Sequence, residues 1–184
     1  MSIDRHWEKR GRILDAAREL FLRQGLRATT MEAIARAAHM AKATLYAEFP
    51  DKDAVFLAIL EHLVAEKLGR FEAALAGPEP LVDRIGAALA AEFGVIAEAL
   101  AGSAHAEELF SAHRLGSALF AASDRTVRDR VTTELSGAGV SDPERLARLV
   151  LDASFGVAQK SIAADTLAED LKLLARRLLG PELT

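Results

Sequence analysis

The five prolines of the chain limit where helices can form. They are Pro50, Pro78, Pro80, Pro143 and Pro181, and they leave long proline-free stretches between them. Because proline lacks a backbone N–H and clashes with the preceding helical turn, it is excluded from helix interiors. Within the proline-free stretches, apolar residues recur every three or four positions, which is the period of a helix with one buried face. No alternating strand pattern of useful length appears. The sequence therefore predicts an all-α fold of about nine helices.

Stop signals divide the apolar stripes into individual helices. The first stripe begins at Ile13 and closes at Gly25, because glycine readily adopts the conformation that ends many helices. Another stripe covers residues 55–76 and ends at Gly77 and Pro78. The stripes further along the chain predict helices over 81–100, 106–113, 118–135, 144–164 and 167–179.

Composition excludes several classes of protein. The chain has 184 residues and no cysteine, which rules out disulfides, thiolate metal sites and a cysteine nucleophile. Its longest stretch without Asp, Glu, Lys or Arg covers residues 115–123, which is too short to span a membrane. The first ten residues are rich in charge and unlike a signal peptide. We expect a cytoplasmic protein without a membrane partner.

Patterns typical of enzymes and metal sites are missing as well. The five histidines show no HExxH or i, i+4 pairing, no serine lies in a GxSxG setting, and the chain has no P-loop. We therefore expect no catalytic activity, no metal and no cofactor.

Charge is divided unevenly along the chain. The net charge of −4 argues against nucleic acid, because binding DNA requires Lys and Arg to neutralise phosphates. Residues 1–52, however, hold ten Lys and Arg against seven Asp and Glu, whereas residues 53–184 hold thirteen against twenty. This asymmetry indicates a positive segment that faces phosphate and an acidic remainder turned away from it.

The most informative stretch has the pattern of a helix-turn-helix. Thr29 and Glu32 have the spacing of a capping box, which predicts the start of its first helix. A turn then leads to a short helix over residues 42–48, anchored to the core by Leu45 and Phe49, one turn apart. Small, hydroxyl and basic side chains on the outer side of this helix are typical of one that enters a major groove. They are Lys42, Ala43, Thr44, Tyr46 and Ala47.

A larger set of residues at fixed spacing covers roughly residues 10–60. It comprises Arg12-Ile13-Leu14-Asp15-Ala16-Ala17, Leu20-Phe21, Gly25, Thr29-Thr30-Met31, Ile34-Ala35, Ala38, Lys42, Thr44-Leu45-Tyr46, Phe49-Pro50, Lys52 and Phe56. This set resembles the TetR/AcrR family of transcriptional repressors. The resemblance implies a DNA-binding domain over residues 1–52, with an arm over 1–9 and the helix-turn-helix at about 30–49. It also implies a ligand-binding and dimerisation domain over 53–184, whose first helix, 53–76, connects the two.

Carried over residue by residue, the resemblance implies contacts to double-stranded DNA. The helix over 42–48 would lie in or beside the major groove, with Tyr46 and Lys52 reaching phosphates. Thr30 would bind a phosphate through its hydroxyl at a helix N-terminus, where the helix dipole favours an anion. Basic residues ahead of the first helix form either an arm that reaches an adjacent groove or a solvated face. The expected contacts are Thr30, Lys42, Ala43, Thr44, Tyr46, Lys52, Arg5 and Arg10.

Two residues depart from the family pattern. Ala43 stands where glycine is common, so it either alters the approach of the backbone to DNA or offers its methyl group to a thymine. Glu48 stands where many members carry an aromatic residue or histidine. Its carboxylate would be repelled by phosphate unless it reads a cytosine amine or pairs with a neighbour such as Arg36.

The carboxy-terminal part supplies the residue types of a pocket for a small-molecule effector, whose identity the sequence does not give. Such a pocket needs a mostly apolar lining with a few polar groups, and each phenylalanine could equally be a core residue. The candidate ligand-binding residues are Phe71, Phe93, Phe110, His113, Phe120, Phe155 and Gln159.

The last two predicted helices carry apolar stripes that suit a four-helix interface in a homodimer. The same leucines could pack within one chain, and the family resemblance favours the dimer. The candidate interface residues are Leu146, Leu149, Ala153, Gly156, Leu171, Leu174 and Leu178.

Together these features predict a sequence-specific transcriptional regulator. A two-fold dimer would place its two recognition helices in successive major grooves, about 34–36 Å apart, and so bind a palindromic operator. A repressor released by its effector is the leading hypothesis. The alternatives are an activator and a helical ligand-binding or scaffolding dimer whose helix-turn-helix is only structural.

Overall fold

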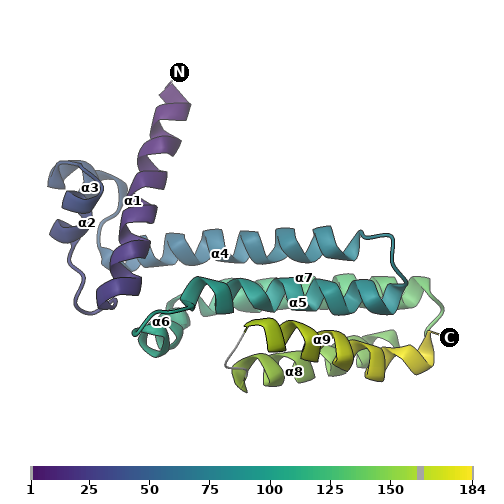
Figure 1. Ribbon diagram of the computed structural model, residues 1–184. Coiled ribbons are helices and arrows are strands. Elements are labelled where there is room, and N and C mark those ends of the chain that lie inside the picture. The colour runs from purple at the N-terminus through teal and green to yellow at the C-terminus, as the bar shows by residue number, and fades with distance from the viewer. Residues whose placement is uncertain (1, 161–163, 184) are drawn as a thin grey trace. The chain divides into compact units, whose positions relative to one another are not determined.

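A computed structural model describes residues 2–160 and 164–183 of the chain (Figure 1). The all-α prediction is confirmed, because the described residues form nine α-helices, two short 3-10 helices and no strand. The helices are α1 (Ser2–Gln24), α2 (Met31–Ala37), α3 (Lys42–Glu48), α4 (Lys52–Leu75), α5 (Leu81–Leu100), α6 (Ala106–Ala112), η1 (His113–Gly116), α7 (Ser117–Gly137), α8 (Pro143–Lys160), α9 (Ala164–Leu179) and η2 (Gly180–Glu182). None of the described helices combines the length and the apolar character needed to cross a membrane.

Several predicted helix boundaries differ from the structure. The helix α1 begins at Ser2, so the expected arm over residues 1–9 is helical over its described part. Neither proline nor glycine precedes Gly11, and nothing in that stretch ends the helix. The helix predicted over 144–164 is described as α8 up to Lys160, residues 161–163 lie outside the described residues, and Ala164 belongs to α9.

The start of α2 lies one residue later than the capping box predicts. Thr30 is the N-cap, and its hydroxyl accepts a hydrogen bond from the Ala33 N–H at 3.1 Å. Thr29 is buried instead, and its hydroxyl donates to the Gly25 carbonyl at 2.7 Å. Thr29 therefore fixes the end of α1 and leaves the capping of α2 to Thr30.

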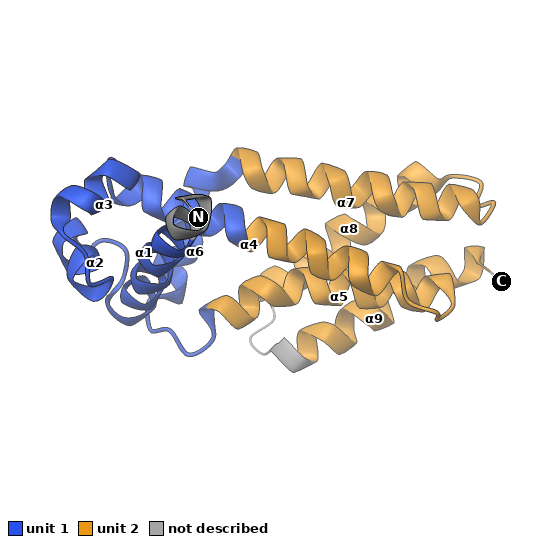
Figure 2. Ribbon diagram, turned by 90° about the horizontal axis from the view of Figure 1, so that it is seen from above, with its two compact units in different colours: residues 1–62, 100–117 blue, residues 63–99, 118–184 orange. Residues whose placement is uncertain are grey.

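The chain divides into two compact units (Figure 2). The first unit contains residues 1–62 together with 100–117, and the second contains 63–99 together with 118–184. The predicted boundary between residues 52 and 53 separates a DNA-binding domain from a ligand-binding domain, and it stays a prediction. The compact units differ from it because residues 53–62 of α4 and the segment 100–117, which contains α6, belong with the amino-terminal helices.

The core of the first unit fixes the recognition helix. Ile13 of α1, Ile34 of α2 and Leu45 of α3 are fully buried. Phe21 and Phe56 meet edge to face, with ring centroids 5.7 Å apart. The predicted anchoring of α3 is confirmed, because Leu45 and the following Phe49 are both buried. The outer side of α3 is thereby held toward solvent.

The second unit is a bundle of five helices. Its main core combines residues from α4, α5, α7, α8 and α9, with Phe71, Leu89, Val131 and Leu179 fully or almost fully buried. A smaller apolar cluster of Ala90, Leu167 and Leu171 joins α5 to α9. Helices that share buried faces in this way form one packed interior, in which any polar side chain needs a partner.

Candidate nucleic-acid interface

The helix-turn-helix is closed by a tight turn between α2 and α3. His39 lies in this turn with φ of 54°, and the next residue, Met40, donates its N–H to the Ala35 carbonyl at 2.9 Å. α3 follows from Lys42, and its outer side presents the residues predicted to contact DNA. Lys42, Ala43 and Tyr46 are exposed, Tyr46 to 42%, and Thr44 is half-buried.

Lys42 is paired in the protein without DNA. Its ammonium forms an ion pair with Glu32 of α2, and both side chains are about half exposed. The hydrogen bond between them lowers the pKa of Glu32 and raises the pKa of Lys42. The Lys42 Nζ also lies 5.7 Å from the centre of the Tyr46 ring. A phosphate that binds Lys42 must therefore compete with Glu32.

Glu48 forms an ion pair within the protein. This confirms the predicted kind of contact, but the partner is Lys9 of α1 and not Arg36. The Glu48 side chain is only 10% exposed, because it is turned toward α1. Next to it, the Arg10 guanidinium stacks over the Phe49 ring at 4.4 Å. Lys9, within the expected arm over residues 1–9, and the adjacent Arg10 thus hold the end of α3. The side chain of Arg5 lies outside the described residues.

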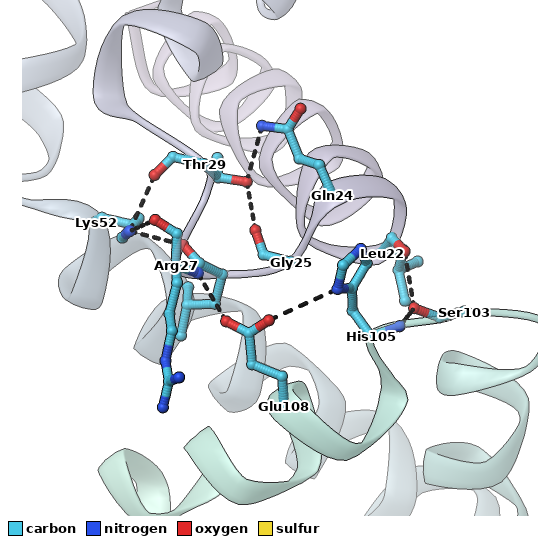
Figure 3. A network of polar contacts seen from close by, with 10 residues as sticks. Leu22, Gln24, Gly25, Arg27, Thr29, Lys52, Ser103, His105 and Glu108 are labelled. Carbon is cyan, nitrogen blue, oxygen red and sulfur yellow. Dashed lines mark hydrogen bonds and ion pairs between the residues drawn. The ribbon is translucent and has the colours of Figure 1, made fainter.

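Lys52, at the start of α4, holds the loop that leads into α2 (Figure 3). An ammonium has three N–H donors, and here three carbonyl oxygens of this loop accept from it. They belong to Leu26 at 2.6 Å, Arg27 at 3.3 Å and Thr29 at 2.9 Å. The phosphate contact of Lys52 stays a prediction, while its carbonyl contacts position the following Thr30.

The segment before and within α6 holds the same loop from another side (Figure 3). The Arg27 N–H donates to Glu108 Oε1 at 2.8 Å, and the Ser103 hydroxyl donates to the Leu22 carbonyl at 2.7 Å. His105 Nδ1 lies 3.7 Å from Glu108 Oε2. Gly25 makes this approach possible: its φ is +84°, and a Cβ there would lie 2.4 Å from Glu108 Oε2. Sequence reasoning missed the two hydrogen bonds, from Arg27 to Glu108 and from Ser103 to Leu22, each of which joins residues 81 apart.

The residues predicted to line a ligand pocket do not form one cluster. Phe110 belongs to the first compact unit, and the side chain of His113 lies outside the described residues. Phe71 is fully buried in the core, whereas Phe155 and Gln159 are exposed on α8. The ligand contacts of these five residues stay a prediction. Phe93 and Phe120 both lie near a buried lysine, with their ring centres 5.9 Å and 5.3 Å from the Lys67 Nζ.

The residues predicted for a dimer interface split between core and surface. Leu171 is fully buried within the protomer, because it lies on the side of α9 that packs against α5, and its side chain is therefore closed to a partner. Leu146, Leu174 and Leu178 are partly buried against the cores. Leu149 and Gly156 are exposed and Ala153 is half-buried. The structure adds Leu173 of α9, an exposed leucine that the sequence pattern did not single out.

Comparison with known proteins places this geometry in a family. Residues 13–59 match the family model of bacterial regulatory proteins, tetR family. A regulator of the TetR/AcrR family from Thermobifida fusca YX-ER1 superposes with a TM-score of 0.70 at 26% identity, over 91% of this chain and 96% of that chain. These matches support a DNA-binding transcriptional regulator of the tetR family, in which α2 and α3 form the helix-turn-helix.

Two further solved structures share the TetR-family fold. A transcriptional regulator from Rhodococcus sp. Rha1 has a TM-score of 0.71 at 21% identity, over 95% of this chain and 98% of that chain. SmeT, the repressor of a Stenotrophomonas maltophilia multidrug efflux pump, is known in complex with triclosan. That complex has a TM-score of 0.68 at 23% identity, over 95% of this chain and 91% of that one. A search of curated protein sequences finds no match.

Proposed function

We propose that this TetR-family protein is a repressor that binds a palindromic operator as a homodimer and leaves it when a small molecule binds. The observation that carries the proposal is the helix-turn-helix, whose second helix buries Leu45 and Phe49 and keeps Lys42 and Tyr46 outside. A short helix held in this way suits the major groove.

The DNA contacts fall into two kinds. Lys42, Ala43, Thr44 and Tyr46 of α3 meet base edges or the adjacent backbone, and Thr30 meets a phosphate at the start of α2. The Thr30 hydroxyl accepts the Ala33 N–H and also interacts with the Glu32 carboxylate, so a phosphate oxygen would take the place of Glu32 as the acceptor of the Thr30 proton. Arg5, Arg10 and Lys52 add positive charge on the same unit.

The homodimer forms through α8 and α9. Leu149 and Leu173 are exposed apolar side chains on these two helices. Gly156, with open space beside it, and the half-buried Ala153 let a partner helix approach Leu149 closely. Burying such leucines against a second copy removes apolar surface from water, which stabilises the dimer.

Effector release uses the covalent connections between the two compact units. The helix α4 begins in the first unit and ends in the second, and the segment 100–117 of the first unit is flanked by α5 and α7 of the second. An effector in the second unit that favours a DNA-incompetent arrangement by about 1–3 kcal/mol weakens operator binding about 5- to 150-fold. SmeT, a repressor of the same fold, binds triclosan, which supports this part of the proposal.

Selection of bound fragments from the genomic DNA of the source organism tests the proposal. We expect enrichment of a palindrome with half-sites one helical turn apart. Tyr46→Ala and Lys42→Ala should lose affinity for it without a change in oligomeric state. Arg125→Ala is the matched control, because this exposed arginine lies on α7. A parent protein without affinity for any selected sequence would support the alternative, a scaffolding dimer whose helix-turn-helix is structural.

A further inference from the structure

The second compact unit contains an ion pair inside its helical bundle. The Lys67 ammonium of α4 lies 3.0 Å from Glu92 Oε1 of α5, and the two side chains are only 4% and 2% exposed. Burying two charges costs several kcal/mol per ion unless further hydrogen bonds satisfy them. The remaining polar atoms of such a pair are therefore expected to be hydrogen-bonded.

Two buried side-chain oxygens of this helical bundle have no hydrogen-bond partner among the described residues. They are Glu92 Oε2 and the hydroxyl of Ser123, a buried residue of α7. Buried polar atoms in native proteins almost always have a hydrogen-bond partner. A lone pair that no protein group satisfies indicates a donor that is not part of this chain.

Aromatic rings flank the same ion pair. The Lys67 Nζ lies 5.9 Å from the centre of the Phe93 ring and 5.3 Å from that of Phe120. Ser123 follows Phe120 by three positions on α7, so both lie on one side of that helix. Rings at this distance attract a cation through their faces and offer apolar contact to a ligand body.

The charges that act on Glu92 leave an excess of negative charge. Burial raises the pKa of Glu92, Lys67 opposes this rise, and Asp124 of α7 adds to it. One ammonium thus stands against two carboxylates. A second cation or strong hydrogen-bond donor would be stabilised at Glu92, whereas an anion would be repelled.

We infer that Glu92, Phe93, Phe120 and Ser123 form a binding site for a small aromatic amine. The ammonium group of the ligand donates to Glu92 Oε2, and its ring packs beside Phe93 and Phe120, while Lys67 keeps its contact with Oε1. The inference rests on the proposed function, because it names the chemical class of the effector.

Calorimetry with 2-phenylethylammonium and 3-phenylpropionate, probes of similar size and opposite charge, tests the site on the full chain without DNA. We expect the ammonium to bind one per protomer and the carboxylate not to bind. Glu92→Gln should weaken ammonium binding at least about tenfold, because a charged acceptor is lost. Glu98→Gln is the matched control: it neutralises an exposed carboxylate of the same helix and should leave binding unchanged.

A second variant keeps the test decisive if Glu92→Gln fails to fold. Ser123→Ala removes an acceptor and leaves the ion pair intact, and it should weaken ammonium binding severalfold. Equal binding of both probes, or unchanged binding in Ser123→Ala and Glu92→Gln, would overturn the site. Ammonium binding that leaves operator affinity unchanged would uphold the site and contradict effector release, so the two proposals fail separately.

Discussion

The recognition helix and the helical bundle each hold a lysine paired with a glutamate, in opposite environments. Lys42 and Glu32 pair across α2 and α3 with both side chains about half exposed. Lys67 and Glu92 pair across α4 and α5 with almost no exposure. Water and salt screen the first pair, so a phosphate can replace Glu32 as the partner of Lys42 at little cost. The second pair is not screened, and each charge depends on the other. Because of this difference in exposure, the Lys42 charge is available to DNA, whereas the Lys67 charge is confined to the interior of the bundle.

The largest effect is expected from breaking the buried pair. Lys67→Met leaves the Glu92 carboxylate without its cation, which should lower the free energy of unfolding by about 3–5 kcal/mol. Adding Glu92→Leu should recover most of this loss, because an apolar pair has no desolvation penalty. Urea unfolding of the single and double variants measures both. A Lys67→Met variant as stable as the parent would show that the pair is not buried in solution.

A third lysine sharpens the comparison because its partners are neutral. Lys52 donates to three loop carbonyls, and Lys52→Met should cost about 1–3 kcal/mol of unfolding free energy. The same variant should also weaken operator binding, since the loop leads into Thr30. Urea unfolding and a DNA titration separate the two effects. Weakened DNA binding at unchanged stability would assign Lys52 to a phosphate contact alone.

The buried pair should also respond to pH. The folded-state pKa of Glu92 is raised above its ordinary value of 4.5, chiefly by burial, with Asp124 adding to the rise and Lys67 opposing it. A raised pKa contributes stability that is fully present below pH 4.5 and is lost as pH rises through the folded value. Relative to Glu92→Gln, the parent should therefore gain stability as pH falls toward 4.5. A stability difference that is constant from neutral pH down to 4.5 would contradict this.

Breaking the exposed pair should have the smallest effect on the free energy of unfolding and a measurable effect on the affinity for DNA. Glu32→Gln frees Lys42 without disturbing the core, so the unfolding transition should stay in place. Operator affinity should rise severalfold, because phosphate no longer competes with a carboxylate for Lys42. Asp170→Asn on α9, an exposed acidic residue outside the DNA-binding unit, is the matched control and should have no effect. Lower affinity in Glu32→Gln would show that Glu32 positions Lys42.

The contrast between the two regions also explains what the sequence could predict. The α2–α3 region follows from local signals, namely Gly25 as a helix end and Leu45 with Phe49 as anchors one turn apart. Its one local error was the choice of Thr29 over the adjacent Thr30 as helix cap. Two neighbouring threonines offer the same chemistry, and only the contact of Thr29 with the end of α1 separates them.

The carboxy-terminal region depends on contacts that no local pattern contains. Lys67 and Glu92 lie on different helices, and in the sequence each resembles an ordinary charged residue of a solvated helix face. Glu108 meets the loop after α1 only because a distant segment packs there. Phe155 and Phe71 have the same residue type and opposite exposure, since the rotation of each helix is set by tertiary packing. Residue type and helical spacing therefore could not predict which of these rings is buried.

Fluorescence anisotropy of a selected palindromic duplex, titrated with protein over a range of salt concentrations, tests the central claim most directly. If α3 reads DNA through Lys42, the logarithm of affinity falls linearly with the logarithm of salt concentration, and Lys42→Ala lowers the magnitude of this slope by about one. The parent should also bind a scrambled duplex far more weakly. Equal affinity for both duplexes, or a slope unchanged by Lys42→Ala, would contradict the account.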